Sequence, residues 1–132
     1  MMMRSLLAAA MVTATPALAE DLRPAPTYYT DAIFSIQMAE ALALSCSSIG
    51  VDLFATQARV TELNELLAAD GFDTDQPFSQ MIDPAPVIRD LQTAFLEKHP
   101  LNDADEPEVC AAAATEIEDD TIIGKLLVKE LE

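Results

Sequence analysis

The residues of this chain that could do chemistry are two cysteines, one histidine and a large number of carboxylates. Cys46 and Cys110 are expected to form a disulfide, because a chain that enters an oxidising compartment leaves them no other partner. A reactive thiol is the alternative, but neither cysteine has a Lys, Arg or His close in sequence to favour the thiolate. The disulfide would stabilise the fold by roughly 4 kcal/mol if it acts by restricting the unfolded chain.

His99 is the only histidine, so a His-rich metal site is excluded. It lies at the expected end of a helix, where contact with the helix terminus explains it better than acid-base catalysis does. The nucleophile elbow Gly-x-Ser-x-Gly is absent. Paired carboxylates could hydrolyse glycosides, but a sugar cleft usually carries aromatic platforms and the chain has no tryptophan. We therefore expect no enzymatic activity and no cofactor.

Two acidic loops could offer oxygen ligands to calcium, at Asp73 to Asp75 and at Asn102 to Asp105. Neither completes an EF-hand, because counting from Asp73 places Phe78 at the required glycine and Pro84 at the bidentate glutamate. Aspartates in turns and at helix caps explain both loops without an ion. A module that binds a divalent cation or small ligand is the alternative function, and no metal ligand is assigned firmly. Its weak candidate ligands are Asp73, Asp75, Asp103 and Asp105.

Acidic residues dominate the charge, since 23 Asp and Glu stand against 7 Lys and Arg and the net charge is −16. Nucleic acid is excluded as a partner, because binding phosphates requires a basic footprint, and an anionic membrane is disfavoured for the same reason. The acids from Glu116 to Asp120 are interpreted as a solvated face. The acidic surface either serves solubility or attracts a cationic partner.

The N-terminus has the three parts of a secretory signal peptide, which are Arg4, the apolar run SLLAAAMV and the small-x-small site Ala17 to Ala19. No later segment reaches the ~20 uncharged apolar residues that span a bilayer. We expect a periplasmic or secreted protein with no membrane insertion after removal of signal residues 1–19. A flexible lead-in, residues 20–30, then precedes a single helical domain, residues 31–132.

Helices must position these residues, because apolar residues recur at helical spacing and no alternating strand pattern of useful length occurs. We expect an all-α bundle of four to five helices with one disulfide. Residues 31–49 form its central helix, capped by Thr30 or Asp31 and apolar all round, so it should be buried on most sides. If a stripe of this helix is exposed instead, it becomes the best candidate for a binding surface.

A second helix over residues 51–69 should fold back antiparallel to the first, with Gly71 as its C-cap. Residues 72–86 are the least regular, although a short helix near Pro77 would fit. A third helix covers residues 87–98.

The last helix should start at Asp105, which forms a capping box with Glu108. Its inward face is expected to carry Cys110, Ala113, Ala114 and Ile117. The helix should break near Asp119 or Asp120, one of which caps a final helical segment, with Gly124 at a tight contact.

Short motifs are spread over the chain from about Asp31 to Leu127. They are Cys46 with Ser48-Ile49, Gly71-Phe72, Thr74-Asp75, Val109-Cys110, Glu116-Ile117, Ile123-Gly124 and Leu126-Leu127. In these motifs the sequence resembles a family of small exported bacterial proteins catalogued as domain of unknown function 5333. It departs from the family after Thr74, where prolines stand in place of an expected long, charge-rich helix. The resemblance implies a helical fold with a disulfide and adds no catalytic residue.

These observations predict a non-enzymatic periplasmic helical protein that acts through protein–protein interaction. Its partner is an unknown protein of the cell envelope, and the acidic surface favours a basic one.

Overall fold

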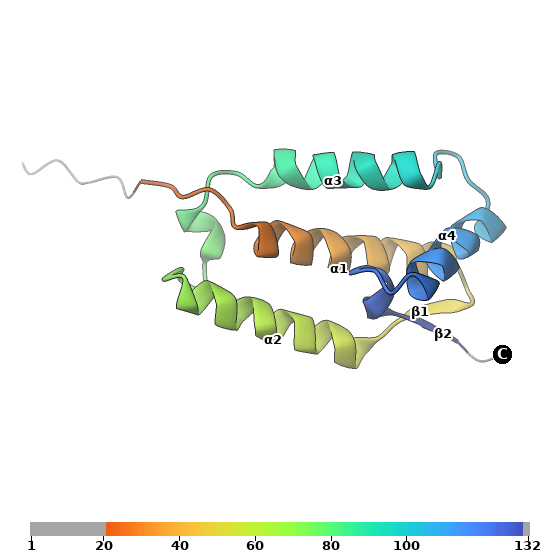
Figure 1. Ribbon diagram of the computed structural model, residues 1–132, viewed down its shortest axis with the longest axis horizontal. Helices are drawn as coiled ribbons and strands as arrows, with labels where there is room; N and C mark the ends of the chain where they lie inside the picture. The colour runs from red at the N-terminus through yellow and green to blue at the C-terminus, as the bar shows by residue number, and fades with distance from the viewer. Residues whose placement is uncertain (1–20, 131–132) are drawn as a thin grey trace, which may run out of the picture.

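The computed structural model describes residues 21–130, and the predicted signal peptide lies outside them. In chain order the elements are α1 (Thr27–Ser45), β1 (Ile49–Val51), α2 (Leu53–Ala69), the 3-10 turn η1 (Pro77–Gln80), α3 (Ala85–Lys98), α4 (Glu106–Glu118), the 3-10 turn η2 (Gly124–Leu126) and β2 (Leu127–Lys129) (Figure 1). The predominantly helical fold with one disulfide is confirmed. None of the helices within residues 21–130 is long and apolar enough to cross a membrane.

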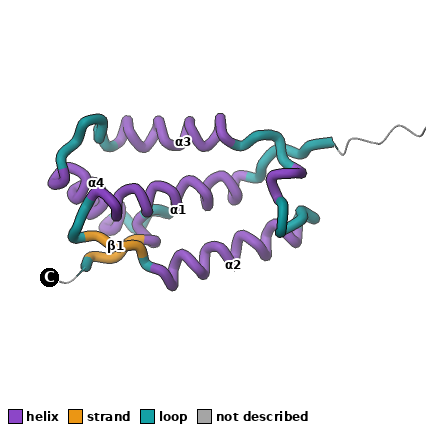
Figure 2. Tube along the Cα trace, turned by 180° about the vertical axis from the view of Figure 1, so that it is seen from behind, coloured by secondary structure: helices purple, strands orange, loops and turns teal. Residues whose placement is uncertain are grey.

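Helix α1 is the central element of the fold. It lies between α2 and α3 in both views (Figures 1 and 2), and it also packs against α4. Helix α2 runs back antiparallel to α1, as predicted, and α3 then returns in the direction of α1. Three helices therefore lie side by side, while α4 packs near the C-terminal end of α1.

The start of α1 differs from the prediction. Pro26 is its N-cap in an extended conformation, and the helix begins at Thr27 rather than after a cap at Thr30 or Asp31. Proline fixes its own φ and lacks an N–H, so it can precede a helix at no cost in hydrogen bonds. The burial expected all round α1 also fails at its other end, where Leu44 is 89% exposed.

Two apolar clusters hold α1 along its length. One forms around its first turns, and its buried members are Tyr29, Ala32, Leu63, Leu67, Phe72 and Met81. The other joins the rest of α1 to α3, α4 and the C-terminal segment, and it includes Phe34, Leu42, Phe95, Val109, Ala113, Ile123 and Leu126. Each large apolar side chain that is fully buried contributes about 1.5–3 kcal/mol, so these clusters are the main source of stability.

Helix α2 ends at the predicted C-cap glycine. Gly71 has φ 79°, its N–H donates to the carbonyl of Ala68, and the N–H of Phe72 donates to the carbonyl of Leu67. These two bonds form a Schellman motif, in which the buried Phe72 packs in the same cluster as Leu67.

The lead-in is anchored to the segment that follows α2. The N–H of Arg23 donates to the carbonyl of Gln80, and the N–H of Ile82 donates to the carbonyl of Arg23. The guanidinium of Arg23 also lies 3.6 Å from the ring centroid of Phe72.

In the middle of the chain, the prolines leave only the short turn η1 where the family resemblance implied a long helix.

The capping box predicted for the last helix is present. The Asp105 side chain accepts from the N–H of Glu108, and the Glu108 side chain accepts from the N–H of Asp105. The predicted break is present too, because α4 ends at Glu118 with Asp119 as its C-cap.

The segment after the break is not the final helix that was predicted. It makes the turn η2 and then β2, which pairs antiparallel with β1 in a register that places Gly50 opposite Val128. The expectation that no sheet forms was therefore wrong, although each of the two strands has only three residues. Strands this short carry too few alternating positions to be visible as a sequence pattern.

Candidate functional site

Glu116 is the one buried charged residue among residues 21–130, and it forms the centre of a polar cluster. Its side chain is 2% exposed. Oε1 accepts hydrogen bonds from Nζ of Lys98 at 3.0 Å and Nε2 of His99 at 2.9 Å, and Oε2 accepts one from the Thr121 hydroxyl. The predicted solvated face was therefore wrong for Glu116, although residues 118–120 are exposed as expected.

Glu116 is buried because the inward face of α4 is rotated by one residue from the predicted face. The buried residues of α4 are Val109, Ala112, Ala113 and Glu116, which also follow i, i+3, i+4 and i+7 spacing. Helix α4 packs mainly against α1 and the turn η2. Lys98 and His99 reach Glu116 from the end of α3.

The C-terminus of α4 fixes the Thr121 side of the cluster. Asp120 has φ 51°, its N–H donates to the carbonyl of Ile117, and the N–H of Thr121 donates to the carbonyl of Glu116. This second Schellman motif turns the chain back, so the Thr121 hydroxyl meets the Glu116 carboxylate. The same hydroxyl accepts from the N–H of Gly124 at 3.0 Å.

The electrostatics of Glu116 are set by two opposing effects. Burial raises the pKa of the carboxyl, but the hydrogen bonds from Thr121, Lys98 and His99 outweigh it and hold the pKa below its usual value. The carboxylate is therefore ionised near neutral pH and only accepts hydrogen bonds. It follows that Nε2 of His99 carries a hydrogen and donates it to Glu116.

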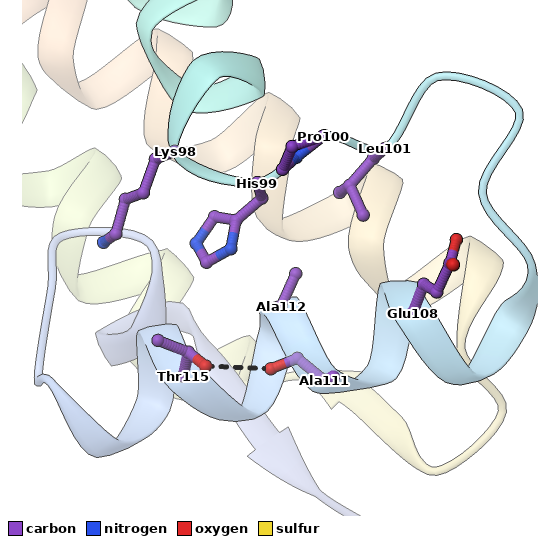
Figure 3. A pocket seen from close by; sticks show the side chains of 8 residues that line it. All are labelled: Lys98, His99, Pro100, Leu101, Glu108, Ala111, Ala112 and Thr115. Carbon is purple, nitrogen blue, oxygen red and sulfur yellow. Dashed lines mark hydrogen bonds between the residues drawn. The ribbon is translucent and has the colours of Figure 1, made fainter.

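A shallow hollow of about 350 Å³ lies beside this cluster, between the end of α3 and α4 (Figure 3). The imidazole of His99 points from the end of α3 toward α4, and Lys98 and Glu108 stand on opposite sides of it. The hydroxyl of Thr115, also in the lining, donates to the carbonyl of Ala111 at 3.0 Å. His99 is further held by the ring of Phe95, whose centroid lies 5.0 Å away.

The hydrogen bonds of this arrangement join neighbouring segments of the fold. A catalytic hydroxyl needs a base that accepts its proton. Here the Thr115 hydroxyl donates to a backbone carbonyl, and His99 donates to a carboxylate that also accepts from Lys98 and Thr121. The cluster thus connects α3, α4 and the segment before η2. The backbone N–H of His99 donates to the carbonyl of Phe95 at the end of α3, whereas its imidazole bonds to Glu116.

Cys46 and Cys110 form the predicted disulfide, with their Cα atoms 5.3 Å apart and a sequence separation of 64. It joins the residue after α1 to the first half of α4. A polar contact lies close by in sequence, because the N–H and hydroxyl of Ser47 donate to the carboxylate of Glu106 at 2.9 and 2.7 Å. These bonds lower the pKa of the Glu106 carboxyl. The same two segments are therefore joined twice.

The weak cation candidates are split between two ends of the molecule. Asp73 and Asp75 follow α2, whereas Asp103 and Asp105 precede α4 at the far end of the bundle (Figure 1). Oδ1 of Asp73 accepts the N–H of Asp75 at 2.9 Å, and Oδ1 of Asp105 caps α4. Within residues 21–130, no three His, Cys, Asp or Glu side chains gather closely enough to hold a metal ion.

Tyr28 makes another polar contact, at the start of α1. Its hydroxyl donates to Oδ2 of Asp70 at 2.6 Å, while Arg23 donates to the backbone carbonyl of Asp70. Burial and the bond to Asp70 raise the pKa of Tyr28 to about 12. The contact ties the start of α1 to the end of α2.

Sequence reasoning missed Lys98 and Thr121 and misplaced Glu116. The available indication was that Glu116 shares helical spacing with Val109, Ala112 and Ala113, which form an alternative inward face. The sequence of α4 contains both the predicted face with Cys110 and the observed face with Glu116, so its composition could not show which one is buried.

Comparison with known families gives one match. Residues 22–128 match the family of unknown function DUF5333. The chain belongs to the DUF5333 family. No curated protein and no solved structure matches it.

Several of the motifs that carry the DUF5333 resemblance meet in space. Glu116-Ile117 and Ile123-Gly124 come together where a Cβ atom on Gly124 would overlap the backbone carbonyl of Glu116. Cys46 and Val109-Cys110 meet at the disulfide. In this DUF5333 chain these motif residues thus hold α4 against α1 and the C-terminal segment.

Proposed function

We propose that this DUF5333 chain is a non-enzymatic binding protein of the periplasm or extracellular space, and that its acidic surface engages a basic protein of the cell envelope. The secretory features of residues 1–19 and the Cys46–Cys110 disulfide support export to an oxidising compartment.

The observation that carries the proposal is the negative charge of exposed carboxylates that no ion pair in the described part of the chain neutralises. Among residues 21–130, the ion pairs of Lys and Arg are Arg59 with Glu62 and Lys98 with Glu116. The carboxylates of residues 118–120 are exposed at the C-terminus of α4, whose last turn carries no basic residue. The negative end of the helix dipole adds to their charge, so a cationic partner would be stabilised by both.

The buried polar cluster supports a non-enzymatic role. The Glu116 carboxylate receives hydrogen bonds from Lys98, His99 and Thr121, and these bonds join neighbouring segments of the fold. The charge of Glu116 is therefore balanced within the fold, whereas the charge of the exposed acids is available to a partner.

Crosslinking in the native envelope tests the proposal. The mature chain should capture a specific basic protein, and capture should fall severalfold when salt is raised from about 0.05 to 0.5 M, because salt screens exposed charges. The triple variant Glu118→Gln, Asp119→Asn and Asp120→Asn should weaken capture in the same way. Asparagine tolerates the left-handed backbone at position 120, so the variant should fold.

A matched control removes three other exposed carboxylates, by Glu65→Gln, Asp90→Asn and Glu97→Gln. It changes net charge equally and should keep most of the capture. Capture that is insensitive to salt and equal in both triple variants would contradict the proposal.

A further inference from the structure

An exposed apolar groove lies where α1 meets β1. Its volume is about 390 Å³, and its apolar lining includes Ala43 and Leu44 from α1 and Ile49 and Val51 from β1. Leu44 is 89% exposed, although it belongs to the helix that the sequence predicts to be buried on most sides. Because water is a poor environment for a leucine side chain, an apolar occupant would be favoured here.

Two more exposed apolar side chains follow β1 in sequence. Leu53 and Phe54 are the first two residues of α2. They are 76% and 91% exposed. Among residues 21–130, Phe54 and Leu44 are the two most exposed of the large apolar side chains. Both lie close to the three-residue strand β1 in sequence.

Two carboxylates border the groove. Glu40 reaches it from α1, and Glu130 reaches it from the residue after β2. A Cβ atom on Gly50 would lie 2.6 Å from Oε1 of Glu130, so this carboxylate lies directly over the strand. None of the described residues that line the groove is basic. The lining therefore favours an occupant that combines apolar side chains with positive charge.

We propose that this groove binds a short segment of the partner that combines apolar and basic side chains. This inference rests on the proposed function and deepens it, because it names the part of a basic partner that would be recognised. A second copy of the chain fits less well, since two chains of net charge −16 repel each other and would bring four groove carboxylates together. Anionic membranes are repelled in the same way.

A five-residue synthetic peptide with three apolar residues between two lysines, acetylated and amidated, is the first probe. Titration into the isotopically labelled mature chain should shift the amide resonances of Leu44, Gly50 and Val51. A peptide with glutamates in place of the lysines should bind at least tenfold more weakly, and so should one with serines in place of the apolar residues. Equal binding of the charge-swapped peptide, or shifts elsewhere only, would overturn the proposal.

Variants of the groove provide the second arm. Leu44→Ser should weaken peptide binding about tenfold, because a central apolar anchor carries much of the binding energy of a small interface. Its high exposure means that the fold should tolerate the change. Val87→Ser on α3, at a residue that is 49% exposed and lies outside the groove, is the matched control and should bind like the wild type.

The charged border is tested by the double variant Glu40→Gln with Glu130→Gln. This variant should weaken binding of the lysine peptide and leave binding of its serine-ended analogue unchanged. Sedimentation of the chain with zwitterionic phosphatidylcholine vesicles should show no binding. Concentration-dependent dimerisation that Leu44→Ser abolishes, or vesicle binding that it abolishes, would overturn the proposal in favour of another occupant.

Failure of this inference is distinguishable from failure of the proposed function. If Leu44→Ser leaves envelope capture intact while the variant at residues 118–120 loses it, the groove assignment is wrong and the acidic binding function stands. If neither salt nor any charge variant affects capture, the proposed function is wrong.

Discussion

Gly124 packs against Glu116 so closely that a Cβ atom at position 124 would overlap the backbone carbonyl of Glu116. The contact places the turn η2 on the end of α4. It also lets the Thr121 hydroxyl bridge the Glu116 carboxylate and the N–H of Gly124.

Gly124→Ala is therefore expected to destabilise the fold by about 3 kcal/mol or more, because backbone atoms must move to admit the methyl group. Gly71→Ala is the matched control. Its φ is 79° but nothing lies within 4 Å of an added Cβ, so the cost should be only the 1–2 kcal/mol of a left-handed residue. Urea denaturation measures both. A larger loss for Gly71→Ala would contradict the contact at Gly124.

Glu116→Gln should lower the free energy of unfolding by about 2–4 kcal/mol. The amide nitrogen of glutamine would face donors in place of a carboxylate oxygen, in a site that is nearly free of water. Lys98→Met is the comparison, and it should cost no more than about 1 kcal/mol because the Lys98 side chain is 46% exposed. The reverse order of the two losses would show that Glu116 is not the centre of the cluster.

Glu116 should also make stability depend on pH in the acid range. Its pKa is lower in the folded chain than its usual value, so the unfolded chain binds more protons and stability falls as pH falls. The contribution is complete above the usual glutamate pKa of about 4.3 and is lost as pH falls through the lower pKa of the folded chain. Urea titrations from pH 6 to pH 3 should show a shallower decline in Glu116→Gln than in the wild type. Parallel curves would refute the assignment.

Removal of the disulfide should lower the free energy of unfolding by about 2–4 kcal/mol, because a loop of 64 residues is released in the unfolded state. The double variant Cys46→Ala with Cys110→Ala, compared with the wild type before and after reduction, measures the loss. Mass spectrometry without reductant should find the native chain two hydrogens lighter than its dithiol form. Equal stability of the variant and the oxidised wild type would contradict a structural role.

Millimolar calcium is expected to leave the melting temperature unchanged. The two acidic loops lie at opposite ends of the bundle, and Asp73 and Asp105 each use a carboxylate oxygen in a local backbone bond. A specific site would raise stability by ~2.7 kcal/mol at a hundred times its Kd. A calcium-dependent rise that Asp73→Asn with Asp75→Asn removes would establish the alternative ion-binding function.

The sequence by itself determined the features that depend on local spacing and on simple chemistry. The helical class follows from apolar periodicity, and the Asp105 capping box and the Gly71 C-cap follow from interactions within a few residues. The disulfide could be predicted because Cys46 had one possible partner. The DUF5333 resemblance was carried by motifs that are contiguous in sequence.

Only the tertiary structure decided which side of each helix is buried. Helix α4 carries two apolar faces one residue apart, and packing against α1 and η2, together with the hydrogen bonds from Lys98 and His99, selected the face that buries Glu116. Likewise the apolar sequence of α1 gave no sign that Leu44 would stay in water. The pairing of β1 with β2 joins residues far apart in sequence over three positions each. Burial of this kind depends on distant neighbours, whose positions local sequence does not encode.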